Sequence, residues 1–365
     1  MKPLALYLPQ FHEIKENNEW WGKGYTEWNA VKSAYPLYRE HYQPKHPLNN
    51  NFYDLGDITA KTWKWQAKLA NQYGIYGFCI YHYWFFTGDQ LLEKPMEILL
   101  NHPEIPINYC VCWANETWRR TWYSSKNEIL KEQRYGDCHE WENHFLYLLK
   151  FFLDPRYIKV ENKPVVCIYR TNQIPVLSDM VSTWNKLAIK NGFSGIYVIS
   201  CNYDGRYDER DGISAYYNYE PWTAIYTHHW NYRILKERCR SRIKRWYNKT
   251  GSHRPLPMFK ISAEYLYNRN ISDLWIHGKK NYLGSMPAFD DTPRRPKKAT
   301  IIYSTADEFY HNLMQIERTL HEQNRNDDFV FINAWNEWGE GAYLEPDEKN
   351  RYSYLDAIRK IVKEV

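Results

Sequence analysis

Three glutamates lie close together near the end of the chain, in the stretch INAWNEWGEGAYLEP. Glu337, Glu340 and Glu345 come directly after the apolar run FVFI, which indicates a buried strand that leads into a loop. A carboxylate beside a buried strand is unfavourable unless a partner or a reaction uses it. Glu337 and Glu340 are three residues apart, and Gly339 and Gly341 allow the backbone to turn both side chains toward one place.

Two neighbouring carboxyl groups in different environments titrate at different pH values, so one can donate a proton while the other accepts one. Cleavage of a glycosidic bond requires this division of roles, because the leaving oxygen must be protonated while the attacking group is activated. We therefore predict that Glu337 and Glu340 are the catalytic pair. The alternative is that one of them is exposed and the other binds backbone amides.

Aromatic residues are abundant, with 17 Trp, 33 Tyr and 14 Phe in 365 residues, and many stand beside Asn, Asp, Glu or His. Flat rings next to hydrogen-bonding groups suit sugars, whose C–H faces stack on rings while their hydroxyls need donors and acceptors. The rings could equally fill a large core, so composition alone does not fix the ligand.

Eight short apolar runs recur along the chain, with helical patterns or loops between them. Alternation of this kind over this length predicts an α/β fold with a parallel sheet, specifically a (β/α)8 TIM barrel formed by residues 1–365 as a single domain with long βα loops. The first run is not followed by a G-x-G-x-x-G turn, which disfavours a dinucleotide-binding fold. The expected strands are 4–11, 76–85, 107–116, 163–170, 195–200, 212–219, 282–289 and 328–335.

Polar and aromatic residues gather at the ends of these expected strands, where the active sites of barrel enzymes lie. We predict that they bind substrate together with the two glutamates. Several have structural alternatives: His82 as a core histidine, Glu116 as a helix cap, Arg294 in a pair with Asp290 or Asp291, and Trp113 and Trp335 as barrel filling. The predicted substrate-binding residues are Tyr7, Gln10, Tyr81, His82, Trp84, Trp113, Asn115, Glu116, Trp118, Asp290, Arg294, Trp335 and Asn336.

The net charge and the cysteine content limit the kinds of binding partner that the sequence indicates. The net charge of +5 is too small to call for a nucleic-acid partner. The seven cysteines form no C-x-x-C pair, so neither a disulfide framework nor a zinc site is indicated, and Cys110 and Cys112 look like small buried hydrophobic residues. We expect no metal and no cofactor, and the sequence does not indicate an oligomeric state.

One segment around residues 228–257 looks like an insertion with a strongly basic helical centre. It is either a solvated helix face or a surface for an acidic partner or an anionic lipid membrane, which would make the contact peripheral. No run approaches the roughly twenty apolar residues of a membrane span, and the first residues lack a signal-peptide core, so a cytoplasmic location is expected.

Five stretches in order resemble one known family: YLPQFHEIKENNEWWGKGYTEW, GIYGFCIYHYWF, CVCWANETWRRTW, FDDTPRR and NAWNEWGEGAYLEP. They resemble WbsX-type proteins of surface-polysaccharide gene clusters, which are usually called glycosyltransferases and are related to glycoside hydrolase family 99, the endo-α-mannosidases. The resemblance implies a (β/α)8 barrel that acts on glycans without a metal.

The same resemblance implies roles for the two glutamates. Glu337 is similar to the base that draws the proton from the sugar 2-hydroxyl, and Glu340 is similar to the general acid, which then activates the incoming water or sugar. The implied intermediate is a 1,2-anhydro sugar.

The sequence thus favours a carbohydrate-active enzyme that acts on a surface polysaccharide such as an O-antigen, or on a related glycan, with an α-mannoside among the candidate linkages. The first alternative is a sugar-nucleotide-dependent glycosyltransferase in O-antigen or capsule synthesis, with charge for a diphosphate from Arg294, Arg295 and Lys297. The second is a non-catalytic glycan-binding barrel.

Overall fold

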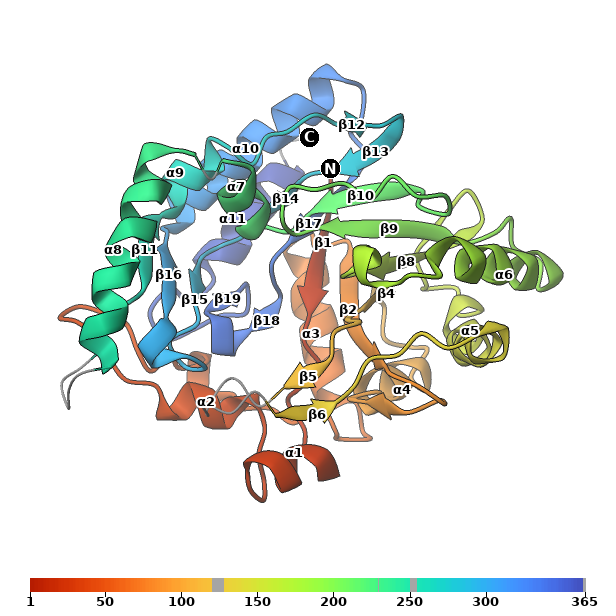
Figure 1. The fold of residues 1–365 in the computed structure, drawn as a ribbon, viewed down its shortest axis with the longest axis horizontal. Coiled ribbons are helices and arrows are strands. Elements are labelled where there is room, and N and C mark those ends of the chain that lie inside the picture. Colours follow the sequence, from red (N-terminus) through yellow and green to blue (C-terminus); the bar gives the residue numbers. More distant parts are fainter. Residues whose placement is uncertain (120–127, 229, 250–254, 364–365) are drawn as a thin grey trace.

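The computed structural model describes residues 1–119, 128–228, 230–249 and 255–363. Parallel strands lie at the centre of the molecule with helices around them (Figure 1). The strands of this central sheet are β1 Lys2–Tyr7, β2 Gly77–Trp84, β4 Asn108–Trp113, β8 Lys163–Ile168, β9 Tyr197–Asn202, β10 Ala215–Asn218, β13 Lys279–Tyr282, β14 Gly284–Ser285 and β17 Phe329–Ile332.

The hydrogen-bonded order of the sheet is β12-β13-β10-β9-β8-β4-β2-β1-β17-β14, and its main pairs are parallel. β1 lies between β2 and β17, so the first strand of the chain pairs with the last strand of the sheet. The segment 279–285 pairs with β10 through β13 and with β17 through β14. The α/β class and the mainly parallel sheet expected from the sequence are confirmed, and a strand lies in each of the eight expected ranges. Short antiparallel strands extend the sheet: β3 Gln90–Leu91, β7 Lys159–Val160 and β12 Trp275–Ile276.

The strands of the sheet are buried along most of their length, as expected for parallel strands covered on both faces. All eight residues of β2 are buried, and so are all four of β17. The helices that surround and extend the sheet are α1 Lys15–Trp21, α2 Glu27–Ser33, α3 Lys61–Gln72, α4 Lys94–Leu100, α5 Cys138–Phe152, α6 Leu177–Lys190, α7 Trp222–Thr227, α8 Tyr232–Lys249, α9 Ala263–Tyr267, α10 Ala306–Glu322 and α11 Ser353–Lys363. Among the described residues, none of the helices has the length and apolar character needed to cross a membrane.

Smaller strand pairs and short 3-10 helices form the loops at one end of the sheet. A hairpin of β18 Asn336–Glu337 and β19 Ala342–Tyr343 follows β17, and the 3-10 helix η4 Trp338–Glu340 joins its two strands. The others are β5 Trp118–Arg119 with β6 Ile129–Lys131, the three-stranded sheet of β11 Phe259–Ser262, β16 Thr300–Tyr303 and β15 Phe289–Asp290, and the 3-10 helices η1 Leu48–Asn50, η2 Thr171–Gln173 and η3 Pro296–Lys298.

The side chain of Asn336 ties this hairpin to the first strand of the sheet. Its amide nitrogen donates to Leu8 O at 3.0 Å, and its oxygen accepts from Leu8 N at 2.8 Å. Asn336 is completely buried. The hairpin is therefore positioned by the backbone that follows β1. The same two hydrogen bonds satisfy the buried backbone N–H and C=O groups of Leu8.

We expect Asn336→Ala to lower the free energy of unfolding by about 2–4 kcal/mol, because it leaves both backbone groups of Leu8 buried without their partner. Chemical denaturation monitored by circular dichroism measures this change. The matched control is Asn326→Ala, which removes an exposed asparagine and should shift stability by less than about 0.5 kcal/mol. Equal stability of the two variants would contradict the role assigned to Asn336.

Candidate functional site

One arginine holds three carboxylates together at the loop end of the sheet. Arg294 Nε donates to Glu27 Oε1 at 2.6 Å, Nη1 donates to Glu340 Oε1 at 2.7 Å, and Nη2 donates to Glu337 Oε2 at 3.0 Å. Arg294, Glu27 and Glu337 are buried, whereas the side chain of Glu340 is 21% exposed. Each of the three carboxylates thus uses a different nitrogen of a single guanidinium.

Distant segments supply these four side chains. Glu27 is the first residue of α2, Arg294 follows β15, Glu337 ends β18 and Glu340 ends η4. Gly339 stands between the two catalytic candidates because no side chain fits there: a Cβ atom would lie 1.7 Å from Glu27 Oε1 and 2.8 Å from Arg294 Nε. The glycine allows the backbone of η4 to approach the ion pair this closely.

The charges of this cluster do not balance, because three carboxylates face one guanidinium. Burial raises the pKa of Glu337 to about 8, although Arg294 acts in the opposite direction, and the charges of Glu340 and Glu27 raise it further. Burial would lower the pKa of Arg294, but the three carboxylates raise it well above its usual value, so the guanidinium stays charged. The cluster therefore retains a proton on Glu337 near neutral pH, which reduces the repulsion between carboxylates.

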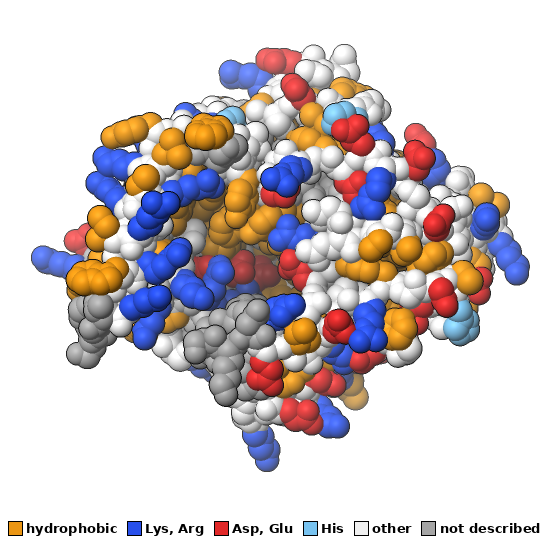
Figure 2. Space-filling model, in the orientation of Figure 1, with side chains coloured by type: hydrophobic (Ala, Val, Ile, Leu, Met, Phe, Trp, Pro, Cys, Tyr) orange, Lys and Arg blue, Asp and Glu red, His pale blue; other side chains and the backbone are white. Residues whose placement is uncertain are grey.

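Glu337 and Glu340 face a cavity of about 550 Å³, large enough for a short oligosaccharide. Figure 2 shows a hollow on this face of the molecule with acidic side chains at its base, in the region where β18 lies in Figure 1. The side chains around the cavity are mainly aromatic, polar or charged. The lining residues are Leu8, Gln10, Trp21, Tyr81, Tyr83, Ala114, Glu116, Thr117, Trp118, Arg119, Leu130, Tyr169, Gln173, Tyr219, Arg294, Glu337 and Glu340.

The walls of the cavity combine rings with hydrogen-bonding groups. The hydroxyls of Tyr81 and Tyr219 lie 3.1 Å apart, and the Tyr83 ring meets Trp118 edge-on with a centroid distance of 5.2 Å. Burial raises the pKa of Tyr81 and of Tyr219 well above the usual value, so both hydroxyls keep their protons. Such a wall offers stacking surfaces and hydroxyl partners to a sugar ring.

A second ion pair closes another side of the cavity. Arg170 Nε donates to Glu116 Oε1 at 3.0 Å, and the guanidinium lies over the rings of Tyr169 and Tyr203 at 4.6 Å and 4.0 Å from their centroids. Glu116 therefore does not act as a helix cap here; it faces the cavity with a fixed orientation.

Of the residues that the sequence predicted for the site, seven line the cavity together. One comes from β2 itself and the others from the regions after β1, β4, β15 and β17, in agreement with the convergence expected of strand ends. They are Gln10, Tyr81, Glu116, Trp118, Arg294, Glu337 and Glu340. The side chain of Arg294 binds the three glutamates, and these hydrogen bonds do not include the alternative pair with Asp290 or Asp291.

Successive side chains of β2 point to opposite faces of the sheet, as in any β-strand. Tyr81 and Tyr83 face the cavity, whereas His82 and Trp84 point to the opposite side. His82 Nε2 lies 2.9 Å from His144 Nε2 on α5, and burial lowers the pKa of His82 to about 3, so its ring is neutral. Trp84 stacks on His144 with a centroid distance of 4.5 Å. His82 and Trp84 therefore pack between the sheet and α5.

The remaining predicted residues also lie outside the described lining of the cavity, in positions that support it. Asn115 accepts from Arg170 N at 2.8 Å and donates to Arg170 O at 2.9 Å, so it fixes the backbone next to the Glu116 ion pair. Trp113 donates to Trp84 O at 2.9 Å. Tyr7, Trp335 and Asn336 are wholly buried.

Asp290 and Glu345 hold the loop around the catalytic candidates. Asp290 Oδ2 accepts from Gln43 at 2.7 Å and lies 2.9 Å from His41 Nε2. Burial would raise the pKa of Asp290, but the His41 hydrogen bond and the Lys45 charge lower it to about 2. Glu345 accepts hydrogen bonds from Tyr53, Gln66 and Trp338 at 2.7–2.9 Å. Neither carboxylate is among the described residues that line the cavity.

Sequence reasoning did not identify Glu27, although the sequence contains a signal for it. Glu27 lies on the same helix face as Ala30 and Val31, at the i, i+3 and i+4 spacing of a buried face, so an acid stands where an apolar residue is expected. Its Oε2 atom is buried and has no hydrogen-bond partner among the described residues. The lining residues that were not predicted are Leu8, Trp21, Tyr83, Ala114, Thr117, Arg119, Leu130, Tyr169, Gln173 and Tyr219.

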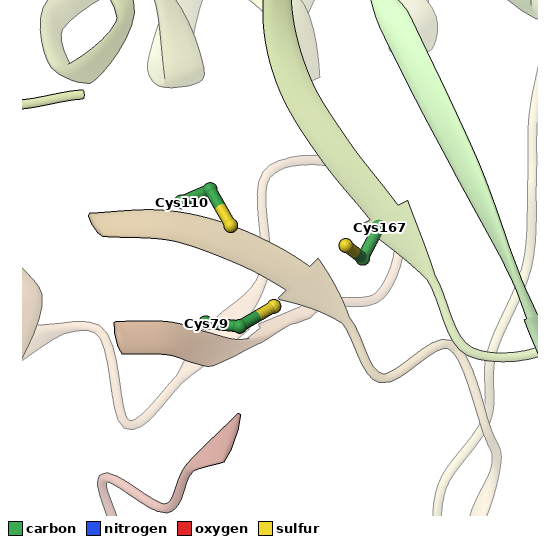
Figure 3. Close-up of side chains that lie close together, drawn as sticks. All are labelled: Cys79, Cys110 and Cys167. Carbon is green, nitrogen blue, oxygen red and sulfur yellow. The ribbon is translucent and has the colours of Figure 1, made fainter. Parts of the chain in front are cut away.

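Three buried cysteines could in principle bind a metal, and they lie away from the cavity. The Sγ atoms of Cys79, Cys110 and Cys167, on β2, β4 and β8, lie within 4.8 Å of one another (Figure 3). A metal held by all three would require three thiolates, but burial raises the pKa of Cys79 and of Cys167 well above the usual value. Burial would also raise the pKa of Cys110, but hydrogen bonds with Cys167 and Cys79 lower it to about 5. Thiols that hydrogen-bond one another between adjacent strands account for these surroundings without a metal.

The whole chain matches a known family. The family model for "Glycosyltransferase WbsX" matches residues 3–358, so the chain belongs to the WbsX family. Proteins called "Uncharacterized protein WxcX" from two strains of Xanthomonas campestris pv. campestris are each 32% identical to it over 360 residues. This match covers 98% of the chain and 49% of each relative, so the chain spans about half the length of the curated relatives it matches.

Solved structures of glycoside hydrolases share the fold. The GH99 endo-α-mannosidase from Bacteroides thetaiotaomicron superimposes with a TM-score of 0.58 at 12% identity, covering 99% of this chain and 96% of the other. A structure described as a glycoside hydrolase-like protein superimposes with a TM-score of 0.57 at 13% identity, covering 98% and 93%. The description of the family names a glycosyltransferase, whereas the first of these solved structures is an endo-α-mannosidase.

We expect Gly339→Ala to separate Arg294 from Glu27, because the added methyl group would occupy the position of the Glu27 carboxylate. The free energy of unfolding should fall by about 3 kcal/mol or more, as expected when a buried ion pair loses one partner. A double-mutant cycle with Glu27→Ala tests this explanation. Removal of the Glu27 carboxylate makes room for the methyl group, so the loss of stability in the double variant should be smaller than the sum of the two single losses. Additive losses in the double variant would contradict this explanation.

The raised pKa of Glu337 predicts a pH dependence of stability. Folding raises this pKa from 4.5 to about 8, so the folded protein holds the proton more tightly than the unfolded chain does. The stabilisation is complete below the unfolded value and is lost as the pH rises toward 8. Between pH 5.5 and 8 the loss due to Glu337 is about 3 kcal/mol.

Chemical denaturation at the two pH values, compared between wild type and Glu337→Gln, isolates this contribution, because Gln cannot lose a proton. The variant should show a smaller decrease in stability with pH. The exposed Glu322→Gln should behave like wild type. The same pH slope in Glu337→Gln and in wild type would contradict the assignment.

Proposed function

We propose that this WbsX-family protein is an enzyme that cleaves or transfers a glycosyl unit of a surface polysaccharide or related glycan, with Glu337 and Glu340 as its catalytic pair. The observation that carries the proposal is the single guanidinium of Arg294, which holds both carboxylates beside a cavity of about 550 Å³ with aromatic walls. We also infer that the parallel sheet forms a closed (β/α)8 barrel in which segment 279–285 is the seventh strand, since this segment pairs with β10 and with β17.

The proposed reaction has two steps. Glu337 takes the proton of the sugar 2-hydroxyl, and the 2-oxygen attacks the anomeric carbon while the bond to the leaving oxygen breaks. Glu340 gives its proton to that leaving oxygen. The product of this step is a 1,2-anhydro sugar, with no bond between sugar and protein. Water or an acceptor hydroxyl then attacks the anomeric carbon and opens the three-membered anhydro ring. Glu340 takes the proton of the attacking water or hydroxyl, and Glu337 returns a proton to the 2-oxygen.

The surroundings of the two glutamates fit these different roles. Without substrate the proton of the cluster lies on Glu337, and the proposed reaction starts from the form in which Glu337 is ionised and Glu340 carries the proton. Glu337 is buried, and the raised pKa of its carboxyl makes its ionised form a stronger base toward a sugar hydroxyl. Glu340 is partly exposed at the cavity, where an acid can reach the leaving oxygen and later the incoming water. Arg294 fixes the orientation of both groups, which is a positioning role.

The second candidate function is transfer from a sugar nucleotide, and the observation that favours it is the description of the matching family as a glycosyltransferase. A diphosphate would need cationic groups at the cavity. Arg294 and Arg295 are committed to carboxylates, because Arg294 binds three of them and Arg295 binds Asp291. Arg119 lines the cavity and is exposed, so it is the better candidate for this contact.

The decisive experiment measures product formation from a panel of surface-polysaccharide oligosaccharides, with and without sugar nucleotides. Under the first proposal, cleavage needs no nucleotide, and Glu337→Gln and Glu340→Gln each reduce kcat by about 100-fold to 10,000-fold. Glu161→Gln, an exposed glutamate on the turn after β7, is the matched control and should keep full activity.

An activated aryl glycoside separates the two roles. A leaving group of low pKa needs little protonation, so Glu340→Gln should regain most of the rate of the first step, whereas Glu337→Gln should not. Product formed only with a sugar nucleotide would establish the transferase function. Glycan binding that is unchanged in both variants, with no turnover by wild type, would establish a non-catalytic binding protein.

A further inference from the structure

Helix α8 concentrates the positive charge of the protein. Eight of its 18 residues are Lys or Arg and one is acidic, whereas the net charge of the whole chain is only +5. Figure 2 shows basic side chains gathered along the edge of the molecule where α8 lies in Figure 1. The proposed catalytic steps use none of these charges.

The helix is a fixed part of the folded protein. Ile234, a residue of its first turn, is wholly buried. Near its end, Asn248 Nδ2 donates to Leu256 O at 2.9 Å and to Lys297 O at 3.0 Å, and Asn248 Oδ1 accepts from Leu256 N at 2.8 Å. The only acid of the helix, Glu237, forms ion pairs with Arg240 and Lys244 at 3.0 Å and 2.9 Å. One side of α8 is therefore held against the protein and the other side faces outward.

The outward side carries apolar residues where polar ones are normal. Tyr232, Ile243 and Trp246 are 71%, 70% and 67% exposed, and their spacing of 11 and 3 residues places them on one stripe of the helix. Exposed cations border this stripe on both sides, with Arg233 and Arg240 on one side and Arg242 and Lys249 on the other. The cations and the apolar stripe thus form a single surface.

We propose that this face of α8 binds an anionic lipid membrane surface and lies in its plane. Trp and Tyr rings favour the boundary between headgroups and acyl chains, while Lys and Arg contact the anionic headgroups beside them. The exposed aliphatic side chain of Ile243 distinguishes this surface from a site for a soluble acidic polymer, which would bind through the cations alone.

The position of the helix gives this contact a consequence for the catalytic candidates. α8 contacts η3, which begins two residues after Arg294. A protein bound through α8 would thus hold the segment that follows Arg294 close to the contact surface. Glycans attached to a membrane anchor would then be concentrated at the cavity mouth. The docking surface itself does not depend on the proposed function.

The test is sedimentation of the full chain with vesicles of phosphatidylcholine alone or of phosphatidylcholine with phosphatidylglycerol. Wild type should bind the anionic vesicles, and added salt should weaken binding because it screens the charges. Arg242→Glu with Lys249→Glu should weaken binding at least about 10-fold, since each cation near the surface contributes about 1 kcal/mol. Ile243→Ser with Trp246→Ser should also weaken it.

The matched control is Lys186→Glu with Lys190→Glu on α6, which makes the same change in net charge beside another exposed isoleucine, Ile189. It should bind like wild type, and so should Glu337→Gln, which separates docking from catalysis. Circular dichroism melting verifies that each variant is folded. Failure of wild type to bind anionic vesicles would overturn the proposal, and so would unchanged binding by the α8 charge variant. Binding lost in the charge variant but kept in the serine variant would overturn the insertion of the apolar stripe and leave only an electrostatic contact.

Discussion

The guanidinium of Arg294 is the constraint on which the site depends. It is buried and donates hydrogen bonds to three carboxylates, and this arrangement requires the planar, five-donor fork of arginine. Each buried charge is tolerable only because the others are present, since removal of one partner from such a group leaves an uncompensated charge. The geometry of Glu337 and Glu340 is thereby set by the same interaction that makes their burial possible.

A ring of ordinary hydrogen bonds keeps this ion cluster in place. Asn336 fastens the hairpin to the backbone after β1, and Glu345 receives hydrogen bonds from Tyr53, Gln66 and Trp338 on the other side of the loop. Asp290 holds the segment that leads to Arg294 through His41 and Gln43. These polar side chains do not line the cavity. Within the motif that follows β17, Glu337 and Glu340 face the cavity, whereas Glu345 positions the loop.

The sequence alone predicted the parallel strands and the most acidic part of the site, because apolar runs and clustered glutamates are local patterns. It did not distinguish which side chains of a strand face the cavity. Tyr81 and His82 are adjacent and equally suited to bind a sugar, and only the orientation of β2 places Tyr81 at the cavity and His82 against α5. Asn115 and Asn336 were predicted as ligands of a sugar, but their amides hold backbone groups instead. Glu27 escaped prediction because its partner Arg294 is 267 residues away in the chain.

The long sequence separation between contacting residues such as Glu27 and Arg294 has a consequence for folding during synthesis on the ribosome. β1 is made first, yet one of its two neighbours, β17, is made more than 300 residues later, and Glu27 finds no partner until Arg294 and the β18–β19 hairpin have been synthesised. At common rates of translation the first strand waits on the order of 15–65 s for its second neighbour. A nascent chain that already holds most of the sheet thus lacks both glutamates of the proposed catalytic pair, and the ion cluster forms only after residue 340 has emerged.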